Sequence, residues 1–133
     1  MPADNVEIVR DAYSAYADGD FGTLLDMVEA DLEWTFLDPS VEDPVDQVCH
    51  GRDQLRQMLA RMQGRGLRVE LEDVRGFGAK VLVTTLTPGL DAHRARKTND
   101  RNFHVLTVQD GRISAMQACR NHEDALALAL APV

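Results

Sequence analysis

The spacing of apolar residues changes along this chain, from helical periods in the first half to strand alternation in the second. Residues 5–18 place Val6, Val9, Tyr13 and Tyr16 three or four positions apart, which forms one stripe on a helix. The same spacing predicts two further helices over residues 21–28 and 52–63. A short strand is expected at residues 32–37, and residues 40–50, which show no clear period, are predicted to form a loop.

The second half of the chain predicts a meander of antiparallel strands. Strand-like runs occupy residues 67–72, 80–87, 103–108 and 112–119, and Asp110-Gly111 between the last two is a strong hairpin signal. Asn121 is a candidate cap for a closing helix that packs back on the sheet. Helices followed by antiparallel strands indicate an α+β fold with helices covering one sheet face. A twisted sheet wrapped around helices would leave a conical pocket for a small molecule.

The length and charge of the chain limit its size class and its partners. A chain of 133 residues is close to the usual size of one domain, so we predict a single domain over residues 1–133. The net charge of -8 argues against nucleic acid and anionic membranes as partners. Basic residues do cluster at His93, Arg94, Arg96, Lys97 and Arg101. This cluster is either a solvated strand connection or a surface for an anionic substrate or a partner.

The sequence predicts a cytoplasmic protein without membrane association. The first 15 residues mix charged and apolar positions, unlike a secretory or transit peptide. No apolar run approaches the roughly 20 residues that span a bilayer. In a reducing compartment, Cys49 and Cys119 are expected to be free thiols.

Short motifs recur in a recognisable order along most of the chain. They are NVEIVR at 5–10, ADGDF at 17–21, DLEW at 31–34, GRD at 51–53, HVLTVQDGRI at 104–113 and HEDAL at 122–126. Together they resemble the SnoaL-like, polyketide cyclase-like family of the nuclear transport factor 2 and ketosteroid isomerase superfamily. The resemblance implies a cystatin-like cone, with N-terminal helices packed in a curved antiparallel sheet, a pocket between them and a homodimer. Members include cyclases, isomerases, epoxide hydrolases, dehydratases and binding proteins, so the fold alone does not give the function.

The resemblance also implies where catalytic groups would lie. In the isomerases, a tyrosine on the first helix and a neutral acid on a late strand polarise a carbonyl, and an aspartate near the first strand moves the proton. Alignment on Gly19-Asp20 puts Ala12 at the tyrosine position, so Tyr16, one helical turn later, becomes the candidate donor. Tyr13 is a candidate pocket residue. Either tyrosine can instead be a core aromatic.

The acid and base positions are displaced in this chain. The aspartate position falls on Phe36, and only a shift of two residues brings Asp38 to it. Asp38 is either a general base, with a pKa that partial burial would raise, or a turn former before a proline. His104 takes the late-strand acid position and shares a strand face with Leu106 and Val108. We expect it either to face a ligand or to be a satisfied core histidine.

Four further residues are predicted to contact the ligand. Leu106 and Met116 belong to inward-facing strand sets, and Trp34 would form a flat apolar wall, although a core role fits its spacing equally well. Arg120 shares the parity of Met116 and is expected at the pocket mouth. There it either pairs with Asp38 or a ligand carboxylate, or forms a salt bridge at the rim.

These residues predict a protein that binds a small hydrophobic, oxygenated molecule such as a polyketide or steroid-like ring. If the protein is an enzyme, cofactor-independent cyclisation or isomerisation would use His104, Asp38 and Tyr16 as acid, base and hydrogen-bond donor. The alternative is a non-catalytic ligand-binding or dimerisation module, and an epoxide hydrolase ranks last because a second acid is missing. No metal or cofactor is predicted, since the histidines lack ligand spacing and no phosphate-binding loop occurs.

Overall fold

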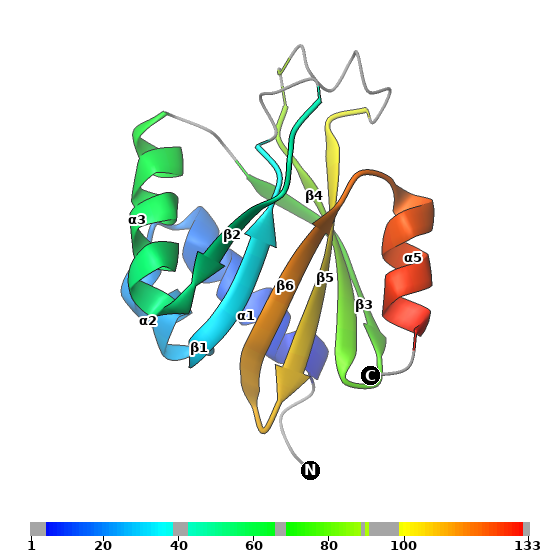
Figure 1. Ribbon diagram of the computed structural model, residues 1–133, viewed down its shortest axis with the longest axis horizontal. Helices are drawn as coiled ribbons and strands as arrows, with labels where there is room; N and C mark the ends of the chain where they lie inside the picture. Colours follow the sequence, from blue (N-terminus) through cyan, green and yellow to red (C-terminus); the bar gives the residue numbers. More distant parts are fainter. Residues whose placement is uncertain (1–4, 39–42, 66–68, 89, 91–98, 132–133) are drawn as a thin grey trace.

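The apolar stripe of the first segment forms a helix, α1 (Asn5–Ala17), and nine further helices and strands follow it in the described part of the chain (Figure 1). The computed structural model describes residues 5–38, 43–65, 69–88, 90 and 99–131. The elements after α1 are α2 (Phe21–Asp26), β1 (Val28–Phe36), β2 (Gln47–His50), α3 (Gly51–Gly64), β3 (Glu70–Phe77), β4 (Lys80–Leu86), β5 (Arg101–Gln109), β6 (Arg112–Cys119) and α5 (His122–Leu130).

The strands of the described residues form one sheet in the order β2-β1-β6-β5-β4-β3. β1 and β6 run parallel, and every other neighbouring pair is antiparallel. At the β5–β6 connection, Asp110 and Gly111 have positive φ angles of 52° and 78°, as a type I′ turn requires. The predicted hairpin is therefore confirmed.

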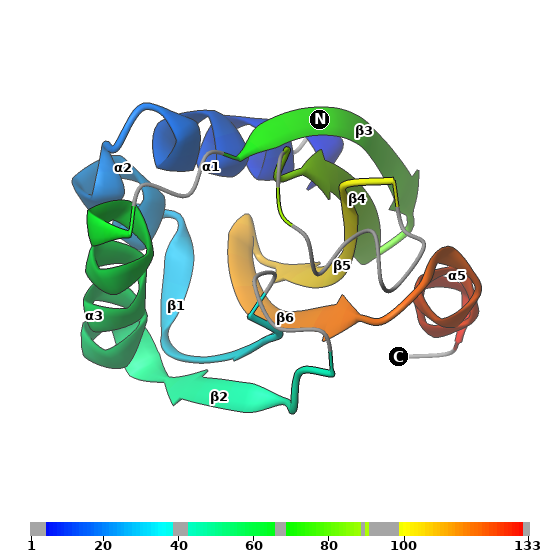
Figure 2. The ribbon, with the colours of Figure 1, turned by 90° about the horizontal axis from the view of Figure 1, so that it is seen from above.

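The sheet has an inner and an outer face, and helices pack against both. Figure 2 shows the sheet curving around the first helices, with α5 outside the curve. Alternate strand residues point to opposite sides: Val83 and Leu106 join the core with α1, α2 and α3, whereas Leu82 and Val105 pack against α5. The α+β cone with N-terminal helices inside a curved sheet is confirmed. The closing helix, expected on the same face as the others, covers the outer face.

Two boundaries near β1 differ from the prediction. Val28, expected to end the second helix, begins β1, because α2 ends at a Met27 cap whose backbone N–H donates to the Leu24 carbonyl. Residues 47–50, expected to lie in a loop, form β2 and pair antiparallel with β1. Three of these four residues are exposed, so β2 carries no apolar period that would announce a strand.

β3 begins and ends later than predicted. It continues to Phe77, and its register with β4 shifts between Leu71 and Asp73, which interrupts the expected alternation. As a result Leu71 is exposed while Val74 is buried. Residues 67–68 of the predicted strand and residues 93–97 of the basic cluster lie outside the described residues.

The closing helix is fixed at both ends. The Asn121 side chain accepts a hydrogen bond from the Asp124 N–H, as its predicted capping role requires. At the other end, the Lys80 Nζ of β4 donates to the Leu128 and Ala131 carbonyls, at 2.9 and 3.2 Å. None of the helices described is long and apolar enough to cross a membrane.

Candidate functional site

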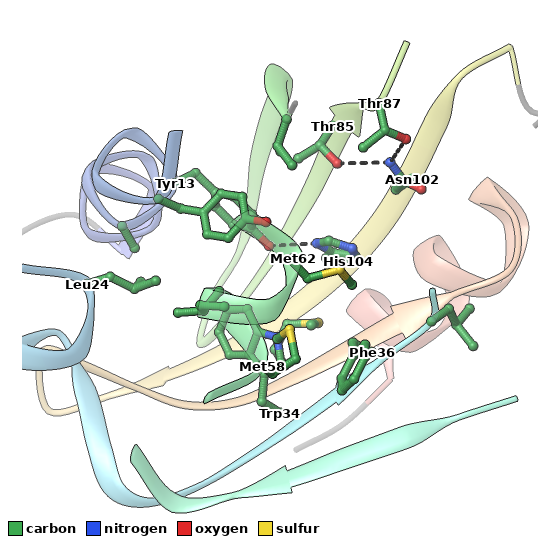
Figure 3. A pocket seen from close by; sticks show the side chains of 16 residues that line it. Tyr13, Leu24, Trp34, Phe36, Met58, Met62, Thr85, Thr87, Asn102 and His104 are labelled. Carbon is green, nitrogen blue, oxygen red and sulfur yellow. Dashed lines mark hydrogen bonds between the residues drawn. The ribbon is translucent and has the colours of Figure 1, made fainter. Parts of the chain in front are cut away.

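A cavity lies between the first three helices and the inner face of the sheet (Figure 3). The centre of a water molecule can occupy about 80 Å³ of it, which leaves room for several waters. Much of the wall is apolar, and its apolar side chains include Leu24, Trp34, Phe36, Met58, Met62 and Met116. Among the described residues that line the cavity there is no Asp, Glu, Lys or Arg.

One polar pair reaches into this cavity from two elements. Tyr13 comes from the stripe of α1, and His104 from β5, where it lies on the same inner face as Leu106. The Tyr13 hydroxyl and His104 Nδ1 are 2.7 Å apart, and the two rings are nearly parallel, with centroids 6.0 Å apart and planes inclined by 25°. Figure 3 shows the two side chains meeting across the pocket. The sequence predicted a role for each of Tyr13 and His104, but not the hydrogen bond between them.

Both members of the pair are uncharged near neutral pH. Burial lowers the pKa of His104 from 6.5 to about 4, because the imidazolium form loses hydration. Burial also raises the pKa of the Tyr13 hydroxyl well above its usual range, and the neighbouring Tyr16 phenol adds to this increase. The pair therefore consists of a neutral phenol and a neutral imidazole.

The direction of this hydrogen bond determines what His104 can offer a ligand. A neutral imidazole has one acceptor nitrogen and one N–H, and a phenol is a ready donor. We therefore assign the Tyr13 hydroxyl as donor, Nδ1 as acceptor and Nε2 as the nitrogen that carries the hydrogen. The His104 ring keeps some accessible surface, and Nε2 has no hydrogen-bond partner among the described residues. Its N–H can therefore be donated to a ligand.

A second polar group lies on the same wall and was missed from the sequence. Asn102, two residues before His104 on β5, lines the cavity together with Thr85 and Thr87. Its Nδ2 donates to the Thr85 hydroxyl at 3.4 Å and to the Thr87 hydroxyl at 3.1 Å. The signal was present, because residues i and i+2 of a strand share a face, so an inward His104 implies an inward Asn102.

Tyr16 lines the cavity but does not bond to His104. Its ring lies 6.1 Å from that of Phe21, measured between centroids, and burial raises its pKa. Within the described residues its hydroxyl makes no hydrogen bond, so it remains a donor for a ligand. Tyr16 was expected to contribute the phenol of the site, but Tyr13, on the same helix, is the tyrosine that bonds to His104.

Asp38 is separated from the cavity. Its carboxylate accepts a hydrogen bond from the Arg65 guanidinium at 2.9 Å, at the point where α3 ends. It lines a second hollow, which adjoins the cavity at Leu37, Asn102 and His104. Asp38, Tyr16 and His104 therefore do not all line one cavity, although the hypothesis of acid–base catalysis needs them to converge.

Arg120 also belongs to the second hollow. It donates to the Pro44 carbonyl and lies 3.4 Å from an Asp43 oxygen, so it forms the rim salt bridge that was one of its two interpretations. The alternative, a pairing of Arg120 with Asp38, is not made. Because the Asp43 side chain is 98% exposed, this ion pair contributes little to stability.

The predicted apolar contact residues divide into two groups. Trp34 and Met116 are paired across β1 and β6, and both line the cavity. Leu106 is fully buried and lies outside the cavity wall, where it supports Met116 on the neighbouring strand. Leu106 is thus placed to support the wall and not to touch a ligand.

The thiols offer no nucleophile. Burial raises the pKa of Cys49, and it raises that of Cys119 to about 11, with help from Asp124 and Asp46. Both cysteines are free. No group of three or more His, Cys, Asp or Glu side chains in the described ranges could hold a metal ion.

Comparison with solved structures shows the same fold in several proteins. A putative polyketide cyclase from Sinorhizobium meliloti matches with a TM-score of 0.66 and 16% identity, over 85% of this chain and 94% of its own. An NTF2-like protein of unknown function from Burkholderia pseudomallei matches with a TM-score of 0.65 and 18% identity, over 96% of this chain and 98% of its own. TerC, co-crystallised with polyporic acid, matches with a TM-score of 0.64 and 18% identity, over 95% of this chain and 97% of its own.

Comparison with sequence families gives the assignment. No curated protein matches the chain in sequence. The model of the SnoaL-like domain matches residues 9–116, which include most of α1, the strands that carry Trp34 and His104, and all described residues of the cavity wall. The chain belongs to the SnoaL-like family.

Proposed function

We propose that the cavity binds a small, uncharged, largely apolar molecule that carries a carbonyl or similar oxygen. The observation that carries this proposal is the composition of the wall, which is apolar apart from neutral polar groups in the described residues. A charged ligand would lose its hydration there without gaining a counter-ion. A ligand oxygen can accept the Nε2–H of His104, and the Tyr16 hydroxyl is a second donor in the same cavity.

The structural neighbours support a small-molecule role. One is a putative polyketide cyclase and another was co-crystallised with polyporic acid. At 16% and 18% identity they share the fold with this chain, so the ligand class proposed here rests on the cavity itself.

Trp34 provides a direct assay, because it is the single tryptophan of the chain and lines the cavity. Its fluorescence should change on titration with 4-methylacetophenone, an uncharged aryl ketone. The matched anion 4-methylbenzoate, of nearly the same shape, should bind at least about tenfold more weakly, because its carboxylate finds no cation in the wall. His104→Leu should weaken ketone binding by about fivefold, the equivalent of one net hydrogen bond.

Two results would overturn this proposal. One is tighter binding of 4-methylbenzoate than of the ketone. The other is a Trp34 signal that responds to neither compound.

A second function, cofactor-independent acid–base catalysis, is favoured by the Tyr13–His104 pair. A neutral imidazole N–H held in place by a second group can polarise a carbonyl, which eases transfer of the neighbouring proton to solvent water or hydroxide. Cyclisation and isomerisation both begin with that step. Hydrogen–deuterium exchange at the methyl group beside the carbonyl of 4-methylacetophenone, followed by NMR in D₂O, tests it. Faster exchange with the wild type than with a folded His104→Leu variant supports catalysis, and equal rates support the binding module.

A further inference from the structure

The Asn102 amide donates hydrogen bonds to two buried threonines. Thr85 and Thr87 are 1% and 3% exposed, and each hydroxyl accepts a hydrogen bond from Asn102 Nδ2. Both amide hydrogens are therefore used. Figure 3 shows the amide oxygen on the side away from Thr87.

The Asn102 oxygen lacks the protein partner that a purely structural amide would have. Within the described residues no donor bonds to Oδ1, and the residue is only partly exposed. Partly enclosed amide oxygens are normally satisfied by protein or by water. Since Asn102 lines the cavity, its free acceptor is available to whatever occupies that space.

The spacing of Asn102 and His104 on β5 sets the distance between the two polar groups that a ligand could bind. The two residues are separated by one position on β5 and share its inner face, which places them about 7 Å apart along the strand. His104 offers an N–H donor and Asn102 offers an oxygen acceptor. A ligand that used both would carry an acceptor oxygen at one end and a hydroxyl at the other.

We infer that Asn102 is a specificity-determining residue that accepts a hydrogen bond from a hydroxyl group of the ligand, with Thr85 and Thr87 as positioning residues. The ligand class is then an uncharged hydroxy ketone, with its ketone at His104 and its hydroxyl across a ring at Asn102. This inference rests on the proposed function, because it assumes that the cavity holds an uncharged ketone.

Two probes that differ in one group test the inference. The compound 4-hydroxyacetophenone places a ketone and a hydroxyl at opposite ends of a benzene ring, and 4-methylacetophenone replaces the hydroxyl by a methyl group of similar size. Affinities are measured from Trp34 fluorescence and from the Trp34 indole N–H signal in NMR. The wild type should prefer the hydroxy compound by about fivefold, as expected for one net hydrogen bond.

Substitutions at Asn102 assign this preference to the amide oxygen. Asn102→Leu should lose the preference and bind the two probes about equally. Asn102→Asp keeps an acceptor oxygen of the same shape and should keep the preference, which makes it the second variant if Asn102→Leu does not fold. Thr87→Val removes one support of the amide and should reduce the preference partly.

The outcomes separate this inference from the proposed function. Equal binding of the two probes by the wild type, or a preference that survives in Asn102→Leu, overturns the role of Asn102 while the cavity remains a ketone site. Failure of both probes to bind overturns the proposed function and this inference together.

Discussion

Acidification should destabilise this protein through the side chain of His104, which borders the cavity. Burial lowers its pKa from 6.5 to about 4, so between these values the unfolded chain binds a proton that the folded chain does not. The stability that this group contributes is complete above a pH of about 6.5 and is lost as the pH falls towards 4. Each pKa unit corresponds to about 1.4 kcal/mol, which gives a loss of about 3 kcal/mol. This is an upper limit, because the ring borders the cavity, where water screens charge.

Urea unfolding at a series of pH values between about 7 and about 4 measures this loss. His104→Gln keeps an acceptor for Tyr13 but does not titrate, so it should lose up to about 3 kcal/mol less than the wild type over the same range. His50→Gln is the matched control, because the His50 side chain is 65% exposed, and it should follow the wild type. Equal losses in the wild type and His104→Gln would refute the buried, neutral imidazole.

Tyr13→Phe should lower the free energy of unfolding by about 1 to 3 kcal/mol, because it leaves His104 Nδ1 without its partner. Tyr16→Phe, which removes a hydroxyl from the same cavity, should change it by less than about 0.5 kcal/mol; equal effects in urea unfolding would contradict this contrast. Lys80→Met should destabilise α5 by roughly 1 to 3 kcal/mol, since it removes two hydrogen bonds to the carboxyl end of that helix. Amide hydrogen exchange in α5 measures the loss, with the exposed Arg112→Met as the control. The homodimer implied by the family resemblance stays a prediction, and sedimentation equilibrium giving the mass of one 14.8 kDa chain would contradict it.

The parts of the fold that depend on neighbouring residues were predictable. The stripe of α1, the Asp110-Gly111 turn and the Asn121 cap each need only a few adjacent side chains. By contrast, the parallel pairing of β1 with β6 joins segments far apart in the chain, so no local pattern specifies it. β2 is also defined by its partner, because its residues are mostly exposed and, in the part of the chain that the structure describes, pair with β1 alone.

The site was predictable to the same limited extent. Strand alternation was enough to infer an inward-facing His104, but not to identify its partner. Tyr13 and Tyr16 lie on one helical stripe, separated by about 4.5 Å along the axis, and which of them meets β5 depends on how α1 is placed along the sheet. Likewise, whether Asp38 enters the cavity depends on where α3 ends, because Arg65 at that end draws it into a salt bridge.

The absence of a carboxylate from the described cavity wall determines which form of His104 could do chemistry. With a pKa of about 4, only about one molecule in a thousand carries an imidazolium at pH 7. Donation of a proton by the charged ring is therefore rare, whereas the neutral N–H is present in almost every molecule. Asp38, in its salt bridge with Arg65, does not line the cavity and is not placed to act as the base. The ratio of the exchange rates of the wild type and His104→Leu should thus rise with pH through about 4 and stay constant towards neutrality, because solvent takes the proton in both. A ratio that rises only near 6.5 would assign the chemistry to another group.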